Sequence, residues 1–190
     1  HQFNTNFSYQ LPVGSGQRFG GGASGLVNRL IGGWQWNGIL TAQTGFPFTP
    51  LIGFNNSGTG DGTQPTDIAD RNPNFKGPAI LGTTDHWFDR RAFSMPTAGT
   101  FGNAGRSTYR GPGLFNVDTS LFKRIPIRES LTLQFRAEAF NVLNHTNFAF
   151  PNQVVFQGNS SSYSYSESAG QITNTATASR QIQFALKLMF

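Results

Sequence analysis

The sequence predicts an all-β chain of antiparallel strands joined by long loops, and three observations support this. The 190 residues include 23 Gly and 19 Phe, only 12% of them are charged, and none is cysteine. Short segments alternate apolar and polar side chains with the period of two that a strand with one apolar face requires. Stretches rich in Gly, Asn, Ser and Thr separate these segments, as loops and turns do.

The segment 181–190 shows the clearest alternation. Its apolar parity consists of Ile182, Phe184, Leu186, Leu188 and Phe190. Polar or small side chains, such as Gln183 and Lys187, occupy most of the other parity. About nine residues is the length of a tilted strand that crosses a bilayer, and one apolar face suits a wall between lipid and a wet lumen. We therefore expect the last strands of a transmembrane β-barrel, or an oligomeric or fibrous β-assembly if the chain is free.

Four more segments alternate in the same way. The further predicted strands are residues 1–11, 33–44, 115–124 and 130–141. Residues 125–129 are predicted to form a hairpin turn, because Pro126 has no N–H to give a sheet. Arg136 and Glu138 are two residues apart on a polar face, so we expect them to pair in a lumen. The apolar spacing of residues 25–31 allows one or two turns of helix.

Two long polar stretches, 45–114 and 145–179, are predicted to be loops within a single β domain or partial barrel that spans residues 1–190. Outer-membrane barrels have long loops on the extracellular side and tight turns on the periplasmic side. Both long loops then lie outside if the last strand runs towards the periplasm. Trp34 and Trp36 share the outward parity, so we interpret them as interfacial aromatics, with sugar stacking as the alternative.

The net charge, the lengths of the apolar stretches and the first residues of the sequence narrow the classes of function that we expect. The net charge of +5 comes from 14 Lys and Arg against 9 Asp and Glu, and the basic residues are scattered. No basic run interleaved with aromatics is present, so we do not expect nucleic acid as a partner. No apolar stretch approaches the roughly 18 residues of a membrane helix. The sequence opens on His1 and has no secretory signal, which indicates a mature or excised piece.

The sequence offers no convincing catalytic or metal site, so we expect no enzyme and no cofactor. Carboxylates flank a histidine in 85–89, but neighbouring residues in a chain rarely converge on one ion. The aspartates Asp61, Asp67 and Asp70 lack the spacing of an EF-hand loop, and calcium binding there is left open. His145 is isolated, no nucleophile elbow surrounds a serine, and the glycine clusters near residues 14–22 are interpreted as turns.

Four segments resemble a known family. Residues 32–48, 101–124, 133–148 and 180–190 are similar, in the same order, to the C-terminal barrel of TonB-dependent outer-membrane receptors. The sequence most resembles the branch of this family whose full-length members begin with a carboxypeptidase-regulatory-like domain. This resemblance implies energised nutrient uptake through a barrel of about 22 strands plugged by an N-terminal domain. It also implies that the alternating apolar residues of 181–190 are the signal for the barrel-assembly machinery.

The five predicted strands are under a quarter of such a barrel, and the sequence contains no plug and no segment to contact TonB. We therefore expect the chain to need a plug and further barrel strands as partners in the bacterial outer membrane. The alternative is a self-associating structural or adhesive extracellular subunit, because open strand edges recruit other strands into oligomers or filaments.

Overall fold

The computed structural model describes residues 1–59 and 67–190. The chain divides into two compact units. The first, here called the sheet unit, comprises His1–Gln43, Phe115–Thr146 and Ala178–Phe190. The second, here called the loop unit, comprises the described parts of Thr44–Leu114 and Asn147–Thr177. Most of the described residues in the two stretches that the sequence predicts as long loops therefore fold together in the loop unit. The single β domain or partial barrel over residues 1–190 stays a prediction.

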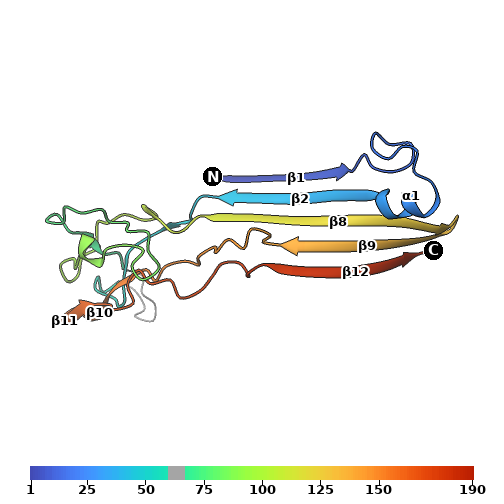
Figure 1. Cartoon of the computed structure of the whole chain (residues 1–190). Coiled ribbons are helices and arrows are strands. Elements are labelled where there is room, and N and C mark those ends of the chain that lie inside the picture. The colour runs from blue at the N-terminus through green and yellow to red at the C-terminus, as the bar shows by residue number, and fades with distance from the viewer. Residues whose placement is uncertain (60–66) are drawn as a thin grey trace. The chain divides into compact units, whose positions relative to one another are not determined.

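The sheet unit is one five-stranded sheet in the order β1-β2-β8-β9-β12, with consecutive strands running in opposite directions (Figure 1). Its strands are β1 (Gln2–Gln10), β2 (Trp34–Gln43), β8 (Leu114–Arg128), β9 (Leu131–Phe140) and β12 (Gln181–Met189). Among the described residues β1 and β12 do not pair with each other, so the sheet is open. The predicted fold class of antiparallel strands is confirmed.

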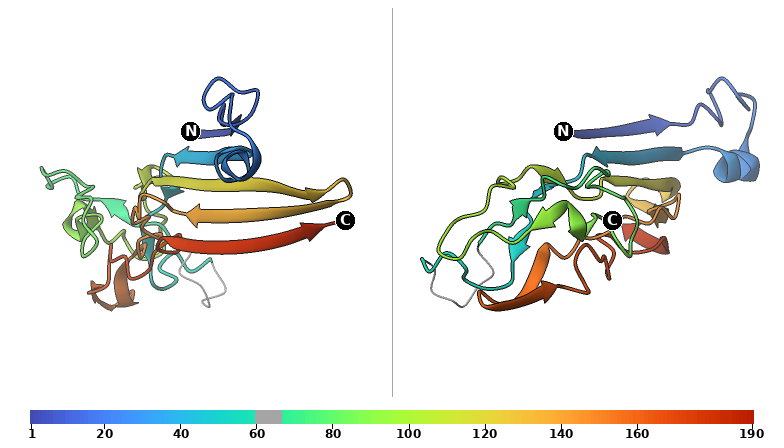
Figure 2. Two further views of the ribbon diagram at one scale, coloured as in Figure 1. Left: turned by 45° about the vertical axis from the view of Figure 1, so that its right-hand side comes forward. Right: turned by 90° about the vertical axis from the view of Figure 1, so that its left-hand side faces the viewer.

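A short helix, α1 (Gly25–Ile31), follows β1 and precedes β2 along the chain. Figure 2 shows it at the end of the sheet where β1 ends and β2 begins. Gly33 follows α1 with a φ of 72°, and a Cβ atom there would lie 2.7 Å from the carbonyl oxygen of Arg124. Only glycine accepts both this backbone conformation and this close approach, so Gly33 fixes where the chain enters β2. No helix in the described part of the chain is long and apolar enough to cross a membrane.

The hairpin between β8 and β9 is tighter than the sequence predicts. The strand β8 continues through Pro126, which lies opposite Thr132, and the turn is Glu129 and Ser130 alone. The N–H of Arg124 bonds the carbonyl of Gly33, just before β2 begins. Pro126 is two residues further along β8, so its backbone nitrogen faces the same side as that of Arg124. The strand β2 does not extend as far as Pro126 on that side. A proline is tolerated there because no ladder bond is lost.

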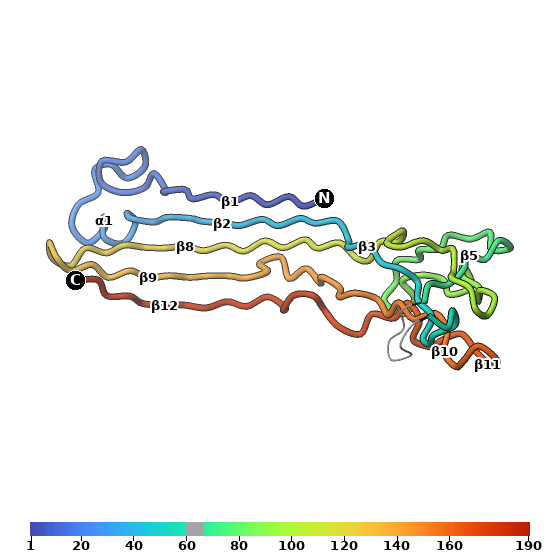
Figure 3. The backbone as a smooth tube through the Cα atoms, turned by 180° about the vertical axis from the view of Figure 1, so that it is seen from behind, coloured from blue at the N-terminus to red at the C-terminus, as the bar shows by residue number. Residues whose placement is uncertain are grey.

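The loop unit contains short strands around an aromatic core. Its elements are β3 (Pro47–Phe48), β4 (Leu51–Ile52), β5 (Asp70–Arg71), the 3-10 helix η1 (Arg90–Ala92), β6 (Phe93–Ser94), β7 (Tyr109–Arg110), β10 (Val154–Asn159) and β11 (Ser162–Tyr165). They form sheets β11-β10-β4, β3-β7 and β5-β6, whose chain path Figure 3 traces. Phe48, Phe88 and Phe93 are buried there, with neighbouring ring centroids 5.5 and 5.7 Å apart.

Candidate membrane-facing wall

One face of the five-stranded sheet is apolar because its strand registers align residues of the same character. Across β12 and β9, Phe184 lies opposite Ala137 and Leu186 opposite Phe135. Across β9 and β8, Ala137 lies opposite Leu121. Phe184 and Leu186 are both 70% exposed. Side chains this apolar are normally buried in a water-soluble protein, so this face is suited to a nonaqueous environment.

The apolar face continues onto β1 and β2. Phe7 lies opposite Gly38, and Tyr9 lies opposite Trp36. The rings of Phe7 and Trp36 meet edge to face with centroids 4.8 Å apart. A Cβ atom at Gly38 would overlap the Phe7 ring, so the glycine makes room for this ring. Between Trp36 and Ile182, over Ala137, lies a shallow apolar hollow of about 450 Å³.

The opposite face carries hydrogen-bonded polar side chains. Gln35 Nε2 donates to Ser8 Oγ at 2.7 Å and to Asn37 Oδ1 at 2.9 Å. Asn37 Nδ2 donates in turn to Ser120 Oγ at 3.3 Å. These bonds link β1, β2 and β8 through side chains as well as backbone. A polar face of this kind is typical of the surface that lines a water-filled lumen.

Arg136 and Glu138 share the polar face as predicted, but they take different partners, so the predicted pair is not formed. Arg136 Nε donates to Gln134 Oε1 at 3.0 Å, and its guanidinium lies 4.8 Å from the centre of the Phe122 ring. Glu138 Oε2 accepts a hydrogen bond of 2.5 Å from Gln183 Nε2. Phe122 lies directly opposite Arg136 and Gln183 directly opposite Glu138, so the register with the neighbouring strands gives each residue another partner.

Lys123 places a charged group on the apolar face, and its parity follows from Leu121 two residues earlier. Lys123 as a whole is only 6% exposed. The ammonium nitrogen lies 4.8 Å from the centre of the Trp34 ring and donates to the carbonyl of Gly32 at 2.5 Å. A long basic side chain that turns its charge towards the end of a strand is suited to a membrane interface. Sequence analysis missed this residue, although its place in the alternation could have revealed it.

The predicted interfacial aromatics are both on the apolar face. Trp34 Nε1 donates to the carbonyl of Leu30 at 3.2 Å, and Trp36 Nε1 donates to Thr119 Oγ1 at 2.7 Å. Each indole therefore has a partner for its polar atom; the Trp36 ring is exposed, and the half-buried Trp34 ring lies beneath the Lys123 ammonium, an arrangement that suits an interface. Their role at an interface stays a prediction.

The residues predicted as the barrel-assembly signal lie on one edge strand. Ile182, Phe184, Leu186 and Leu188 line the apolar face of β12, and Phe190 follows the strand at 94% exposure. Because β12 pairs only with β9 in the described structure, its other edge offers free backbone groups. Recognition by the assembly machinery stays a prediction.

The end of β9 is fixed by a polar turn that the sequence did not reveal as a site. Asn141, with a φ of 49°, donates from Nδ2 to the carbonyls of His145 and Ala178. The carboxylate of Asp118 accepts the N–H of Asn141 at 2.8 Å. Asparagine tolerates this left-handed conformation better than most residues. This turn therefore joins β8, the end of β9 and the approach to β12.

In the loop unit, the residues of 85–89 point to separate partners. Trp87 Nε1 donates to the carbonyl of Arg110 at 2.8 Å, and Phe88 is buried in the core. The Asp89 carboxylate accepts from the Arg91 side chain at 2.7 Å, and this bond holds the pKa of Asp89 below its ordinary value. Burial raises the pKa of Tyr165, whose hydroxyl donates to the carbonyl of Phe93.

The predicted aspartate cluster is only partly within the described structure, because Asp61 lies outside it. Asp67 is buried and accepts from the N–H groups of Asn56 and Ser57 at 2.6 and 2.7 Å. Asp70 accepts from the N–H of Asn103 at 2.8 Å. Both carboxylates therefore hold loop backbone. Within residues 1–59 and 67–190, no group of three or more His, Cys, Asp or Glu is placed to hold a metal.

These features define a wall of amphipathic antiparallel strands, apolar on one face and polar on the other, of the length that crosses a membrane. Comparison with known families gives the same result: residues 1–183 match the outer membrane β-barrel domain. The chain belongs to this family. Searches of curated proteins and of solved structures gave no significant match.

Proposed function

We propose that the chain forms part of the barrel wall and extracellular loops of a TonB-dependent receptor that takes up nutrients across the bacterial outer membrane. The observation that carries this proposal is the five-stranded sheet itself. It has one apolar face and one polar face, and within residues 1–59 and 67–190 its two edges, β1 and β12, are unpaired. Further strands at those edges would extend the wall, because membrane-embedded backbone must be fully hydrogen-bonded.

The segments that resemble the receptors supply the structural details of this wall. Residues 32–48 include Gly33 and both indoles of β2, and residues 101–124 include most of β8. Residues 133–148 contain the Asn141 turn, and residues 180–190 contain β12. The resemblance therefore includes residues that build four of the five strands as well as parts of the loop unit, which supports a receptor barrel over an unrelated sheet protein.

The first test is the intact mass of the native protein, extracted with and without detergent. A receptor should have a mass far above the 20.7 kDa of this chain and should need detergent. Its barrel should also migrate faster on a gel before heating than after. A 20.7 kDa product that stays in water would contradict the proposal.

Energised uptake requires a second test. Strains that lack this protein, strains that lack TonB and the parent strain should be compared for growth on a panel of single limiting nutrients. We expect at least one nutrient on which both deletions cause the same defect. If removal of the protein impairs growth only where removal of TonB does not, the barrel is not a TonB-dependent receptor.

The two unpaired edges also favour a second candidate, a self-associating structural or adhesive subunit. Copies of the sheet could pair β12 with β1 and pack apolar faces together. Native mass measurements distinguish the two candidates, because this second function predicts assemblies in whole multiples of the chain mass in the absence of detergent.

A further inference from the structure

The helix α1 exposes an unusually apolar surface for its length. Leu26, Val27 and Leu30 are 75%, 56% and 71% exposed. Residues three and four apart share one face of a helix, so these three side chains form one continuous surface, here called the α1 apolar surface. Water is an unfavourable environment for such a surface.

The other side of α1 is held by the rest of the sheet unit. The side-chain oxygen of Asn28 accepts the N–H of Ser15 at 2.6 Å. Ile31 packs so closely on the turn before the helix that a Cβ atom at Gly20 would lie 2.8 Å from its Cδ1. The orientation of α1 is thus fixed by its own packing, and the α1 apolar surface is directed away from these contacts.

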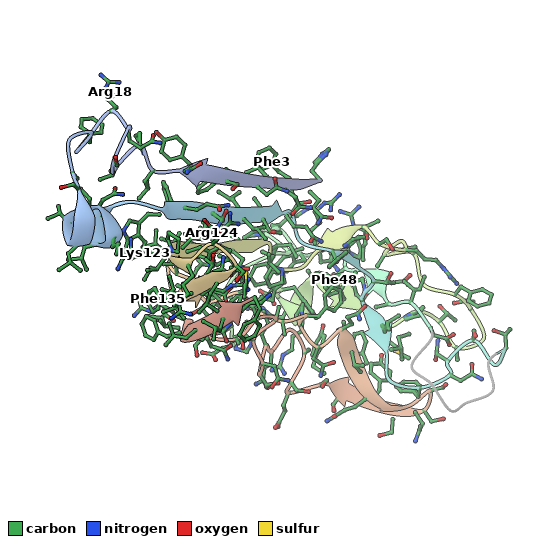
Figure 4. The ribbon with its side chains drawn as sticks, turned by 90° about the vertical axis from the view of Figure 1, so that its right-hand side faces the viewer. Phe3, Arg18, Phe48, Lys123, Arg124 and Phe135 are labelled. Atoms are coloured by element: carbon green, nitrogen blue, oxygen red, sulfur yellow. The ribbon has the colours of Figure 1, made fainter. Side chains whose placement is uncertain are left out.

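The carboxyl end of α1 lies on the apolar face of the sheet. The Trp34 indole donates to Leu30, and Lys123 donates to Gly32 while it lies over the Trp34 ring. Both Trp34 and Lys123 belong to the apolar face. Figure 4 shows α1 on the side of the sheet towards which Lys123 and Phe135 project. The α1 apolar surface therefore continues the membrane-facing wall at its end.

This end of the sheet is also strongly basic. Its charged residues in 11–33, 121–133 and 185–190 are Arg18, Arg29, Lys123, Arg124, Arg128 and Lys187, with Glu129 as the one acid. Each Lys or Arg near an anionic membrane surface strengthens attachment to it. An apolar helix surface flanked by basic residues is typical of helices that lie in a membrane interface.

We propose that α1 lies in the headgroup region of the phospholipid leaflet at this end of the wall. Leu26, Val27 and Leu30 contact the upper acyl chains, and Arg18 and Arg29 bind lipid phosphates. The ligand is a phospholipid headgroup in a bilayer. This inference rests on the proposed membrane wall and adds a lipid-binding element outside the strands.

Site-specific fluorescence tests the proposal, and residues 1–190 contain no cysteine that would compete for the label. Single cysteines would replace Leu26, Leu30, Gly22 or Phe184 in the protein purified with its barrel intact, and each would carry an environment-sensitive fluorophore. The labelled proteins would be reconstituted in vesicles of phosphatidylethanolamine and phosphatidylglycerol, with or without bromine high on the acyl chains. Gly22 is exposed and has no atoms near its Cβ position, so it is the control for an aqueous loop.

We expect labels at Leu26 and Leu30 to be blue-shifted and quenched by the brominated lipid, and the label at Gly22 to be neither. If the Phe184 label is quenched while the Leu26 and Leu30 labels behave like Gly22, the interfacial helix is wrong and the membrane wall stands. If the Phe184 label is also in water, the membrane wall itself is wrong. The two failures are therefore distinguishable.

The lipid-phosphate contact has its own test. With the label at Leu26, Arg29→Gln should reduce quenching in vesicles that contain phosphatidylglycerol, and it should have little effect in vesicles of phosphatidylcholine alone. An Arg106→Gln variant, at an exposed arginine of the loop unit and outside this basic end, is the matched control. Equal effects of Arg29→Gln in both lipids would overturn the proposed role of Arg29.

Discussion

The sheet unit and the loop unit use apolar residues in opposite ways. Every buried hydrophobic residue in the described chain, from Phe48 to Ile172, belongs to the loop unit. In the sheet unit the buried residues include Lys123, Gln134 and Asn141, whereas Phe184 and Leu186 are exposed. The same chain therefore contains one unit organised for water and one organised for lipid.

This comparison shows that burial within the chain is a poor guide to the environment of a barrel segment. The loop unit is stabilised by transfer of aromatic surface out of water into its own core. The sheet unit hydrogen-bonds its backbone internally and leaves its apolar face for the membrane. Four sets of substitutions separate these two modes of stabilisation.

Truncation of a core phenylalanine should cause the largest loss of stability in the loop unit. Phe88→Ala removes a fully buried ring that contacts Phe48 and Phe93, and we expect it to lower the free energy of unfolding of the loop unit by about 3–5 kcal/mol. Phe184→Ala removes the same ring from the exposed face and should leave the loop unit unchanged. The urea dependence of protease cleavage within the loop unit measures both. Equal sensitivity of the two variants would contradict the division between the units.

A charge should be costly on one face of β12 and tolerated on the other. Phe184→Arg places a guanidinium on the lipid side, and we expect a loss of about 2–4 kcal/mol near the bilayer midplane. Gln183→Arg, one residue earlier, faces Glu138 on the polar side and should assemble normally. Unfolding in urea from lipid vesicles and gel mobility before heating report the difference. If Phe184→Arg assembles as well as Gln183→Arg, the apolar face does not contact lipid.

The buried carboxylate of Asp67 should matter through hydrogen bonding. It accepts two backbone N–H groups and the hydroxyl of Ser57 at 3.1 Å. Asp67→Asn replaces one acceptor oxygen with a donor, and we expect the loop unit to lose about 1–3 kcal/mol. Asp85→Asn, at an exposed carboxylate, is the control. The protease assay applies here too, and no difference between the two variants would show that the Asp67 bonds are dispensable.

Asp89 should give the smallest effect, which is present at neutral pH and lost in acid. Its pKa is lowered mainly by the hydrogen bond from Arg91, so ionised Asp89 stabilises the folded unit above the ordinary value of 3.8. That stability is lost as the pH falls through the lowered pKa. The loop unit of Asp89→Asn should therefore be less stable than wild type at pH 7, and the gap should close in strong acid. A gap that does not change with pH would contradict this role of the Asp89 charge.

The alternation in the sequence located the sheet well because the period of two is a direct consequence of strand geometry. The ranges 1–11 and 181–190 contain β1 and β12. The alternation that starts at Ile182 also predicted which residues form the apolar face of β12. The resemblance to receptors pointed to an outer-membrane barrel, which the family comparison confirms. The receptor branch itself stays a proposal.

The loop unit could not be predicted in the same way. Its strands are mostly two residues long, too short to show a period, and partners such as Ile52 and Phe156 are far apart in the sequence. The partners of Arg136 also depended on the register with neighbouring strands. Pro126 misled the prediction because its tolerance depends on where β2 begins, which is a property of the sheet and not of the hairpin.

The loop unit is built from two chain segments that are separated by β8 and β9. The parallel pair β4 and β10 contains one strand from each segment, and Tyr165 of the second segment bonds Phe93 of the first. Neither segment therefore holds a complete core. A recombination event or a graft that exchanges only one of these loops would leave exposed aromatics on the other, so the two loops should be inherited and engineered together as one cassette.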